Sequence, residues 1–262
     1  MLTDSSSPGL DCQLLLGKVT QQSRAWLLAH DDQYLSTTQQ QALAALLARR
    51  ANGEPMAYLL GTQGFWDMEL QVSPATLIPR PETEQLVELL QTLPPEPTLK
   101  VIDLGTGSGA IAIAISRERP QWDLYATDSS AAALTVARRN AQRWCTTPIT
   151  FIHTDWLQTF GPASFDVIVA NPPYIDPQDT HLPALRYEPT SALVAAANGF
   201  ADLATIISQA KICLRPGGRL LLEHGYQQQP QLQTLLSDQG FINIQTYTDL
   251  NQQPRAIMAQ QP

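Results

Sequence analysis

Four consecutive residues of this chain combine groups that could hold and orient a planar amino group: Asn171, Pro172, Pro173 and Tyr174. They follow an apolar run from residue 165 to residue 170, which is typical of a buried parallel strand. The prolines stop the strand and have no N–H, so the carbonyl groups here can accept hydrogen bonds from another molecule. The Asn171 side-chain oxygen and the Pro172 carbonyl could accept the two protons of an NH2 group, and the Tyr174 ring could stack on it. Considered alone, the four residues are also compatible with a proline-rich turn.

A glycine-rich turn earlier in the chain is the candidate cofactor site. It follows an apolar strand that ends near Asp103 and precedes an apolar helix that begins near Ala110. Glycines let the backbone approach a ligand, and the N-terminus of a helix favours negative charge. Asp128 ends the next predicted strand, where a carboxylate suits the two hydroxyls of a ribose. The candidate residues of the turn are Gly105, Thr106, Gly107, Ser108 and Gly109.

The glycine turn by itself is compatible with more than one cofactor. Gly105, Gly107 and Ala110 also satisfy the dinucleotide fingerprint, so an NAD-dependent oxidoreductase is a competing interpretation. Glycines that serve only a tight strand-to-helix turn are a third. Two observations favour S-adenosylmethionine over NAD. Gly109 comes one residue early for the usual dinucleotide spacing, and Asn171 follows the predicted fourth strand, where a substrate would meet the methyl group.

Strands and helices alternate through the C-terminal part of the chain. This alternation predicts an α/β fold with a mostly parallel, seven-stranded sheet, helices on both faces and ligands at the carboxyl ends of the strands. The connection between residues 248 and 254 is too short for a crossover helix, so the last two strands should pair antiparallel. The strands are expected near residues 99–104, 122–127, 149–153, 165–170, 218–224, 241–247 and 255–259, and the helices near residues 109–118, 130–144, 200–214 and 229–239.

The chain is expected to divide into three segments. Residues 1–60 carry helical signals and no strand signals, which predicts a small N-terminal helical domain. Residues 61–80 contain glycines and prolines between short apolar runs and are interpreted as a hairpin-like connector. Residues 81–262 are interpreted as the catalytic domain.

The charge of the chain bears on its partners. The formal net charge is −8 and the sequence pI is about 4.9. We find no lysine- or arginine-rich stripe, although a protein that binds a nucleic-acid backbone normally has a basic face. We therefore expect no direct nucleic-acid binding. This weighs against an enzyme that methylates amino groups of nucleic-acid bases with the same four residues, although a local basic patch is compatible with an acidic total.

The remaining composition indicates a metal-free cytoplasmic protein. Three cysteines and four histidines are scattered without the spacing of a metal site or a disulfide framework: Cys12, Cys145, Cys213, His30, His153, His181 and His224. Every apolar run is shorter than the roughly 18 residues of a membrane span. Residues 1–7 lack the basic and apolar regions of a signal peptide. We therefore expect no metal, no membrane association and a cytoplasmic location.

Several segments together resemble one family. From about residue 50 to its end, the chain is similar to the release-factor glutamine N5-methyltransferases (the HemK/PrmC family). The stretch from Ile78 to Glu84, joined to the glycine turn and to Asn171–Tyr174, is more specific than any of these elements alone. Residues 249–255 depart from the pattern, because they lack a glycine that similar proteins usually have. The matching segments are residues 55–61, 65–66, 77–84, 103–109, 171–174, 187–189, 192–193 and 216–223.

The resemblance implies a Rossmann-like class I S-adenosylmethionine-dependent methyltransferase with an N-terminal helical domain that recognises the substrate. Its reaction would transfer a methyl group from S-adenosylmethionine to the side-chain amide nitrogen (N5) of a glutamine in the GGQ motif of peptide-chain release factors. The alternatives are methylation of an exocyclic amino group of a nucleic-acid base and a non-catalytic cofactor-binding module.

The resemblance also implies roles for the candidate residues. Asn171 and the Pro172 carbonyl would receive the glutamine amide and Tyr174 would pack against it, with Pro173 in the same substrate-binding group. The segment from Gly105 to Gly109 would hold the methionine part of the cofactor, and Asp128 its ribose. Trp156 follows the third predicted strand and could pack on the adenine ring, or it could be an ordinary half-buried aromatic residue.

Two further segments have alternative interpretations. Residues 80–84 could be a charged first turn of a helix, or could cover the cofactor and link the two domains. Residues 175–199 could be a disordered surface loop. Because they directly follow the candidate site and are long for a plain connection, they could also form a lid that faces the substrate.

Overall fold

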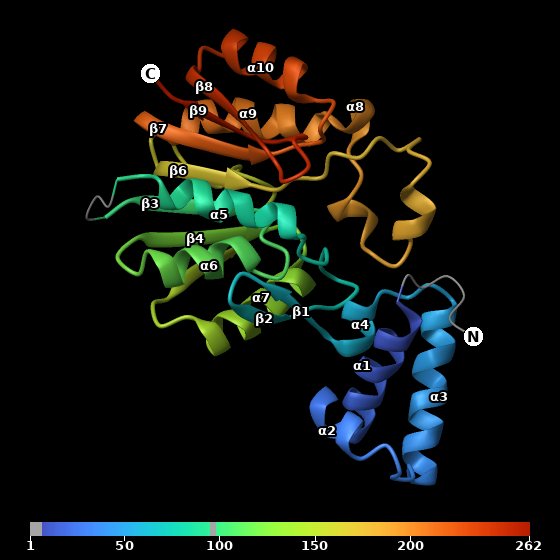
Figure 1. The fold of residues 1–262 in the computed structure, drawn as a ribbon. Helices are drawn as coiled ribbons and strands as arrows, with labels where there is room; N and C mark the ends of the chain where they lie inside the picture. Colours follow the sequence, from blue (N-terminus) through green and yellow to red (C-terminus); the bar gives the residue numbers. More distant parts are fainter. Residues whose placement is uncertain (1–6, 95–97) are drawn as a thin grey trace. The chain divides into compact units, whose positions relative to one another are not determined.

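The computed structural model describes residues 7–94 and 98–262, and the chain divides into two units, Met1–Gln63 and Gly64–Pro262 (Figure 1). Each unit is described by itself. The expectation that residues 1–7 are not a signal peptide concerns residues that lie almost wholly outside the described part of the chain. Among the helices in the described part of the chain, none is both long enough and apolar enough to span a bilayer.

The first unit is helical. Its helices are α1 (Pro8–Thr20), α2 (Arg24–Ala29), α3 (Thr37–Ala51) and α4 (Met56–Leu60). Ser36 caps α3 reciprocally: its hydroxyl accepts from the Gln39 N–H at 3.3 Å, and the Gln39 side chain accepts from the Ser36 N–H at 2.9 Å. Near the end of α3, Arg50 donates to the Asp11 carboxylate of α1 at 2.7 Å. This ion pair fastens α3 to α1.

The described residues of the second unit form a seven-stranded sheet in the order β5-β4-β3-β6-β7-β9-β8. The strands are β3 (Lys100–Leu104), β4 (Asp123–Asp128), β5 (Ile149–His153), β6 (Phe165–Ala170), β7 (Leu214–Glu223), β8 (Ile242–Thr248) and β9 (Pro254–Gln260). Strands β3 to β7 pair parallel, whereas β9 pairs antiparallel with both β7 and β8. The expected mostly parallel sheet with an antiparallel final pair is therefore confirmed.

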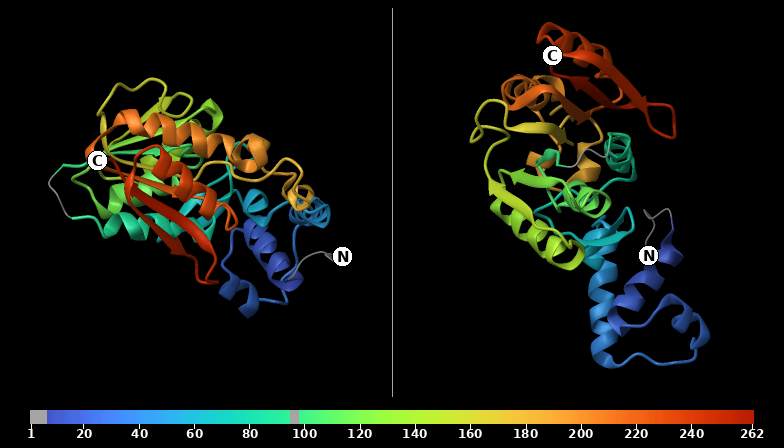
Figure 2. Two further views of the ribbon diagram at one scale, coloured as in Figure 1. Left: turned by 90° about the horizontal axis from the view of Figure 1, so that it is seen from above. Right: turned by 90° about the vertical axis from the view of Figure 1, so that its left-hand side faces the viewer.

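Helices cover both faces of this sheet (Figures 1 and 2). The longer ones are α5 (Glu84–Gln91), α6 (Ala110–Glu118), α7 (Ala131–Trp144), α9 (Ala201–Cys213) and α10 (Gln229–Asp238). The shorter ones are η1 (Pro81–Thr83), η2 (Leu182–Leu185), η3 (Thr190–Ala192) and α8 (Ala196–Gly199).

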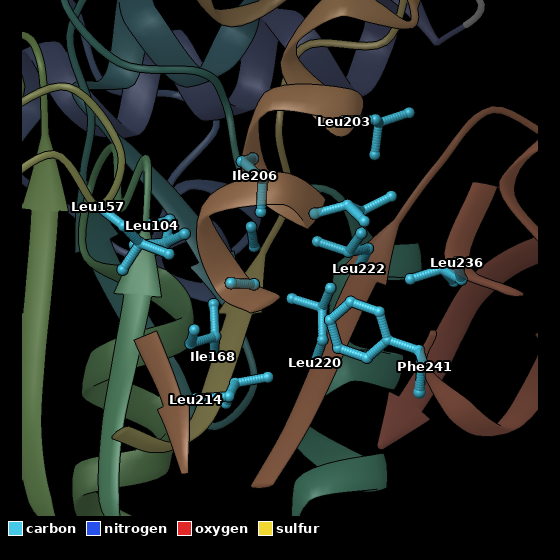
Figure 3. Close-up of a cluster of buried hydrophobic side chains, with 14 of the residues drawn as sticks. Leu104, Leu157, Ile168, Leu203, Ile206, Leu214, Leu220, Leu222, Leu236 and Phe241 are labelled. Carbon is cyan, nitrogen blue, oxygen red and sulfur yellow. The ribbon is translucent and has the colours of Figure 1, made fainter. Parts of the chain in front are cut away.

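Successive residues of the central strands point to opposite helical layers. On β3, Ile102 and Leu104 belong to a cluster with α9 and α10, whereas Val101 belongs to a cluster with α5 and α6. Figure 3 shows the first of these clusters, in which Ile206 of α9 and Leu222 of β7 take part. Because both faces are buried, the central strand β6 is apolar at every position except Asp166.

A short β-hairpin, β1 (Thr62–Phe65) and β2 (Met68–Gln71), lies in the segment that was expected to be a connector. Phe65 and Leu70 are buried against α5 and α6. The Asn140 side chain, on α7, accepts from the Gln71 N–H at 2.7 Å and donates to the Gln71 carbonyl at 2.9 Å. It also donates to the Ser108 carbonyl at 2.8 Å, so one buried amide joins β2 to the glycine turn.

The turn between β8 and β9 is the place where the sequence departs from the pattern of the family that it resembles. Gln252 adopts the left-handed conformation there, with a φ of 61°. The Asp249 carboxylate accepts from the N–H groups of Asn251 at 2.8 Å and Gln253 at 2.9 Å, and it also pairs with Arg255. Hydrogen bonds to the Asp249 carboxylate therefore hold the turn without a glycine.

Candidate active site

The glycine turn between β3 and α6 requires its glycines for two reasons. Gly105, Gly107 and Gly109 have φ angles of 65°, 56° and 85°, in the left-handed region that other residues rarely adopt. A Cβ on Gly109 would also lie 2.9 Å from the Ile113 side chain and 3.3 Å from Ala137. The turn is therefore close-packed against α6 and α7 on the side of Gly109.

Two aspartates hold the turn by hydrogen bonds. The Thr106 hydroxyl donates to the Asp103 carboxylate at 2.6 Å, and burial raises the pKa of Asp103 to about 7. The Asp128 carboxylate accepts from the Gly107 N–H at 2.9 Å and from the Ser130 N–H at 2.8 Å. Burial raises the pKa of Asp128 above its ordinary value, and these backbone hydrogen bonds oppose the rise. Asp128, which was expected to hold the ribose of the cofactor, thus also supports the backbone of the glycine turn.

A first hollow opens beside the turn at the carboxyl ends of β3, β4 and β6 and has about 670 Å³ of empty space, part of it open to solvent. The expected site residues that line it are Gly105, Gly107, Asp128, Trp156, Asn171 and Pro173. In the described part of the chain, Thr106, Ser108 and Gly109 are buried in the turn and do not line this hollow.

A second hollow adjoins the first. Asn171 lines both, together with Leu77 and Ala192. Pro172 and Tyr174 line the second hollow only, and so does Arg80. Molecules bound in the two hollows would therefore meet beside Asn171.

Hydrogen bonds between side chains hold the Asn171–Tyr174 segment. The Asn171 side-chain NH2 donates to the Thr83 hydroxyl at 3.0 Å, and Thr83 donates to the Glu223 carboxylate at 2.7 Å. The Tyr174 hydroxyl donates to the other oxygen of Glu223 at 3.1 Å. Sequence reasoning considered Thr83 only as part of residues 80–84, which could cover the cofactor, and assigned no role to Glu223. The available signal was the position of Glu223, a carboxylate at the end of a buried strand.

Residues 175–199 are folded, so the interpretation as a disordered loop is wrong. The Ile175 N–H donates to the Leu193 carbonyl at 3.0 Å, and the Ala195 N–H donates to the Ile175 carbonyl at 3.1 Å. Glu188 anchors the segment, because its buried carboxylate pairs with Arg80 and accepts from the Ile78 N–H at 3.0 Å. The segment also lines both hollows, through η3 in each case and through Leu185 and Leu193 in the second.

Trp156 lies in the wall of the first hollow with an unusual backbone. Its φ angle is 44°, in the left-handed region. A Cβ on Gly105 would lie 3.2 Å from the Trp156 ring. The indole therefore lies close to the glycine turn. Sequence reasoning missed another part of the lining, Ala75 and Thr76, because these residues carry no charge or conspicuous spacing.

The sheet order and the glycine turn define a Rossmann-like methyltransferase of class I, which uses S-adenosylmethionine. The sequence profile of the Methyltransferase small domain matches residues 84–247, and that of the PrmC N-terminal domain matches residues 1–61. A solved methyltransferase from Pyrococcus furiosus has the same fold, with a TM-score of 0.57 at 15% identity over 83% of this chain and 96% of that one.

Curated relatives identify the family. The release factor glutamine methyltransferase of Coxiella burnetii is 45% identical over 99% of this chain and 94% of the relative. The enzyme of the same name from Salmonella typhimurium is 46% identical over 95% of this chain and 90% of the relative. The chain belongs to the release factor glutamine methyltransferase family.

The residues of the first hollow fit S-adenosylmethionine. A Cβ on Gly107 would meet no atom nearer than the Gly105 carbonyl oxygen at 4.0 Å, so the turn is open on this side and a ligand can approach its backbone. Each Asp128 oxygen accepts one backbone N–H and keeps a further lone pair, which suits ribose hydroxyls. In the described residues, no group of three His, Cys, Asp or Glu side chains could hold a metal ion.

Proposed function

We propose that this protein transfers a methyl group from S-adenosylmethionine to the side-chain amide nitrogen (N5) of a glutamine in the GGQ motif of peptide-chain release factors. The observation that carries the proposal is that, in a chain of this family, Asn171 borders both hollows. An amide in the second hollow could thus face a methyl donor in the first.

The proposed catalytic groups act by positioning. A carboxamide nitrogen is a weak nucleophile, because its lone pair is delocalised into the carbonyl group. The Asn171 side-chain oxygen and the Pro172 carbonyl accept its two N–H groups, which aims the nitrogen and favours a pyramidal geometry in the transition state. S-adenosylmethionine, when bound, supplies an electrophilic methyl group on a sulfonium.

Tyr174 completes the substrate side of the proposed site, whereas Pro173, which was also expected there, lines the first hollow. The Tyr174 hydroxyl already donates to Glu223, and burial raises the pKa of this phenol above its ordinary value. Its role in the proposal is therefore to pack its ring against the amide, not to accept a proton. A strong base is unnecessary, because the N-methylated amide cation is very acidic.

On the cofactor side, the proposal assigns the methionine part to the segment from Gly105 to Gly109 and the ribose to Asp128. The indole of Trp156, which lines the first hollow, is assigned to the adenine ring. Thr106, Ser108 and Gly109 contribute by shaping the turn, since their side chains or Cα atoms are buried within it.

The proposal also concerns partners and location. Residues 1–60 are assigned to recognition of the release factor, and residues 81–262 to catalysis, with the hairpin segment 61–80 between them. A net charge of −8 supports a protein substrate and no direct binding of nucleic acid. Because its substrate acts in translation, the proposed location is the cytoplasm.

The test is methyl transfer from labelled S-adenosylmethionine to a purified release factor, with RNA and DNA as parallel substrates. We expect label in the release factor and a mass increase of one methyl group on the glutamine of its GGQ motif. The matched control is a release factor in which this glutamine is replaced by alanine, and it should remain unlabelled. Label in nucleic acid and none in protein would overturn the proposal.

A further inference from the structure

Four side chains from three separate segments form a hydrogen-bonded chain beside the second hollow. It runs from Asn171 to Thr83 of η1, then to Glu223 at the end of β7, and returns to Tyr174, with donor–acceptor distances of 3.0, 2.7 and 3.1 Å. Thr83 and Glu223 are 5% and 2% exposed. These four residues are called the Thr83–Glu223 relay below.

The relay determines which way the Asn171 amide faces. A hydroxyl has one proton to donate, and Thr83 gives it to the Glu223 carboxylate, which can only accept when it is ionised. Thr83 must therefore accept from Asn171, so the Asn171 nitrogen faces Thr83. The Asn171 oxygen is then left for a ligand in the hollows that Asn171 lines.

Glu223 is the anchor of the relay because it supports both ends of the Asn171–Tyr174 segment. One carboxylate oxygen accepts from Thr83 and the other from Tyr174. Burial raises the pKa of Glu223, and the hydrogen bonds from Thr83 and Tyr174, together with the charge of Arg255, favour its ionised form. The ionised form is the one that keeps Thr83 as an acceptor toward Asn171.

We infer that Thr83 and Glu223 are positioning residues, which hold the Asn171 amide with its oxygen toward the reacting nitrogen of the substrate. This inference rests on the proposed function of the site. Thr83 and Glu223 touch neither ligand in this scheme and act through Asn171 and Tyr174.

The test compares Thr83→Val, which removes the hydroxyl at nearly constant volume, with Thr83→Ser, which keeps it. For Thr83→Val we expect kcat to fall about 10- to 100-fold, the range seen when ligands at metal sites lose their outer hydrogen-bond partner. Affinity for the cofactor product S-adenosylhomocysteine should stay unchanged, and Thr83→Ser should retain most of the kcat. The matched control is Thr127→Val, because within the described residues the buried Thr127 hydroxyl has no hydrogen-bond partner.

A double-mutant cycle separates positioning from general support of the fold. If Thr83 acts through Asn171, adding Thr83→Val to Asn171→Ala should cause almost no further loss of kcat. Additive losses from the two substitutions would overturn the inference, and so would a wild-type kcat in Thr83→Val.

A measurement on the unmodified protein distinguishes failure of the relay from failure of the proposed function. The Asn171 side-chain NH2 resonance is assigned by NMR from its absence in Asn171→Asp. We expect slow solvent exchange of one of its protons in the wild type and in Thr83→Ser. Fast exchange in the wild type would overturn the relay even if methyl transfer occurs. Slow exchange without methyl transfer to a release factor would leave the relay standing and overturn the function.

Discussion

Backbone geometry shapes the glycine turn, whereas side chains hold the Asn171–Tyr174 segment. In the turn, Gly105, Gly107 and Gly109 adopt left-handed conformations, and Asp128 accepts from two backbone N–H groups. In the Asn171–Tyr174 segment, the relay joins side chains to one another. The difference matches what each region has to hold: a large ligand that needs close approach of the backbone, and a small amide that needs correctly oriented acceptors.

The two regions should respond differently to substitutions. A backbone-built region should respond to a change in volume or conformation at a glycine, and the response should appear in stability and cofactor binding. A region built from side-chain hydrogen bonds should respond to a change of donor or acceptor at constant volume. There the response should appear in kcat, while the fold survives.

The largest expected effect is at Asn171. Asn171→Ala removes an acceptor aimed at the reacting amide, so kcat should fall roughly 100- to 1000-fold and substrate affinity much less. Asn171→Asp keeps an acceptor but removes the NH2 that donates to Thr83. The single Thr83 proton would then face two carboxylates, the introduced one and that of Glu223. We therefore expect this variant to be nearly as inactive as Asn171→Ala, with circular dichroism showing an intact fold.

Steady-state kinetics of the two Asn171 variants decide how this region works. Substantial activity in Asn171→Asp would mean that the side chain acts as an acceptor alone, and the proposed dependence on the relay would be wrong. Wild-type turnover in Asn171→Ala would remove the residue from the mechanism.

The next largest effect tests the close packing of the turn. Gly109→Ala places a methyl group 2.9 Å from Ile113 and imposes a left-handed backbone on alanine. We expect a loss of about 2–5 kcal/mol in the free energy of unfolding, from about 1–2 for the backbone and about 1–3 for overpacking. Gly217→Ala is the control, because Gly217 has a φ of 79° but its Cβ would meet only Gln260, at 3.8 Å. Equal losses in urea unfolding of the two variants would show that packing adds nothing at Gly109.

A smaller effect is expected for Asp128→Ala, measured as cofactor affinity by calorimetry. The substitution removes the proposed acceptor for the ribose hydroxyls and the acceptor of the Gly107 N–H. Affinity for S-adenosylhomocysteine should fall by about 1.5–3 kcal/mol. Asp123→Ala, at the exposed start of the same strand, should leave the affinity unchanged. An unchanged affinity in Asp128→Ala would place the ribose elsewhere.

The same contrast explains what could be predicted from the sequence. The sheet followed from local patterns, because apolar runs alternate with helical segments and strands β8 and β9 are separated by a short turn. The nearness of Gly105, Asp128 and Asn171 followed from the rule that ligands bind at the carboxyl ends of parallel strands. The relay could not be predicted, because Thr83 lies 88 positions from Asn171 and 140 from Glu223, and no periodicity relates them. Ala75 and Thr76 in the lining of the first hollow were missed because they carry no charge or conspicuous spacing.

The smallest expected effect tests why the cofactor turn contains glycines. Gln252 has a φ of 61°, close to that of Gly105 and Gly107, yet this position is not a glycine. Asp249 holds that turn by accepting from two backbone N–H groups, so a left-handed φ alone does not require glycine. Replacing Gln252 by glycine removes about 1–2 kcal/mol of backbone strain but makes the unfolded chain more flexible, which costs about 0.4–1 kcal/mol. We expect a net gain of roughly 0.5 kcal/mol in the free energy of unfolding and unchanged methyl transfer. A clear loss of stability would mean that the Gln252 side chain stabilises the turn. A gain would mean that the cofactor turn has glycines for two other reasons: a ligand approaches its backbone, and the turn is close-packed. Neither reason applies to Gln252.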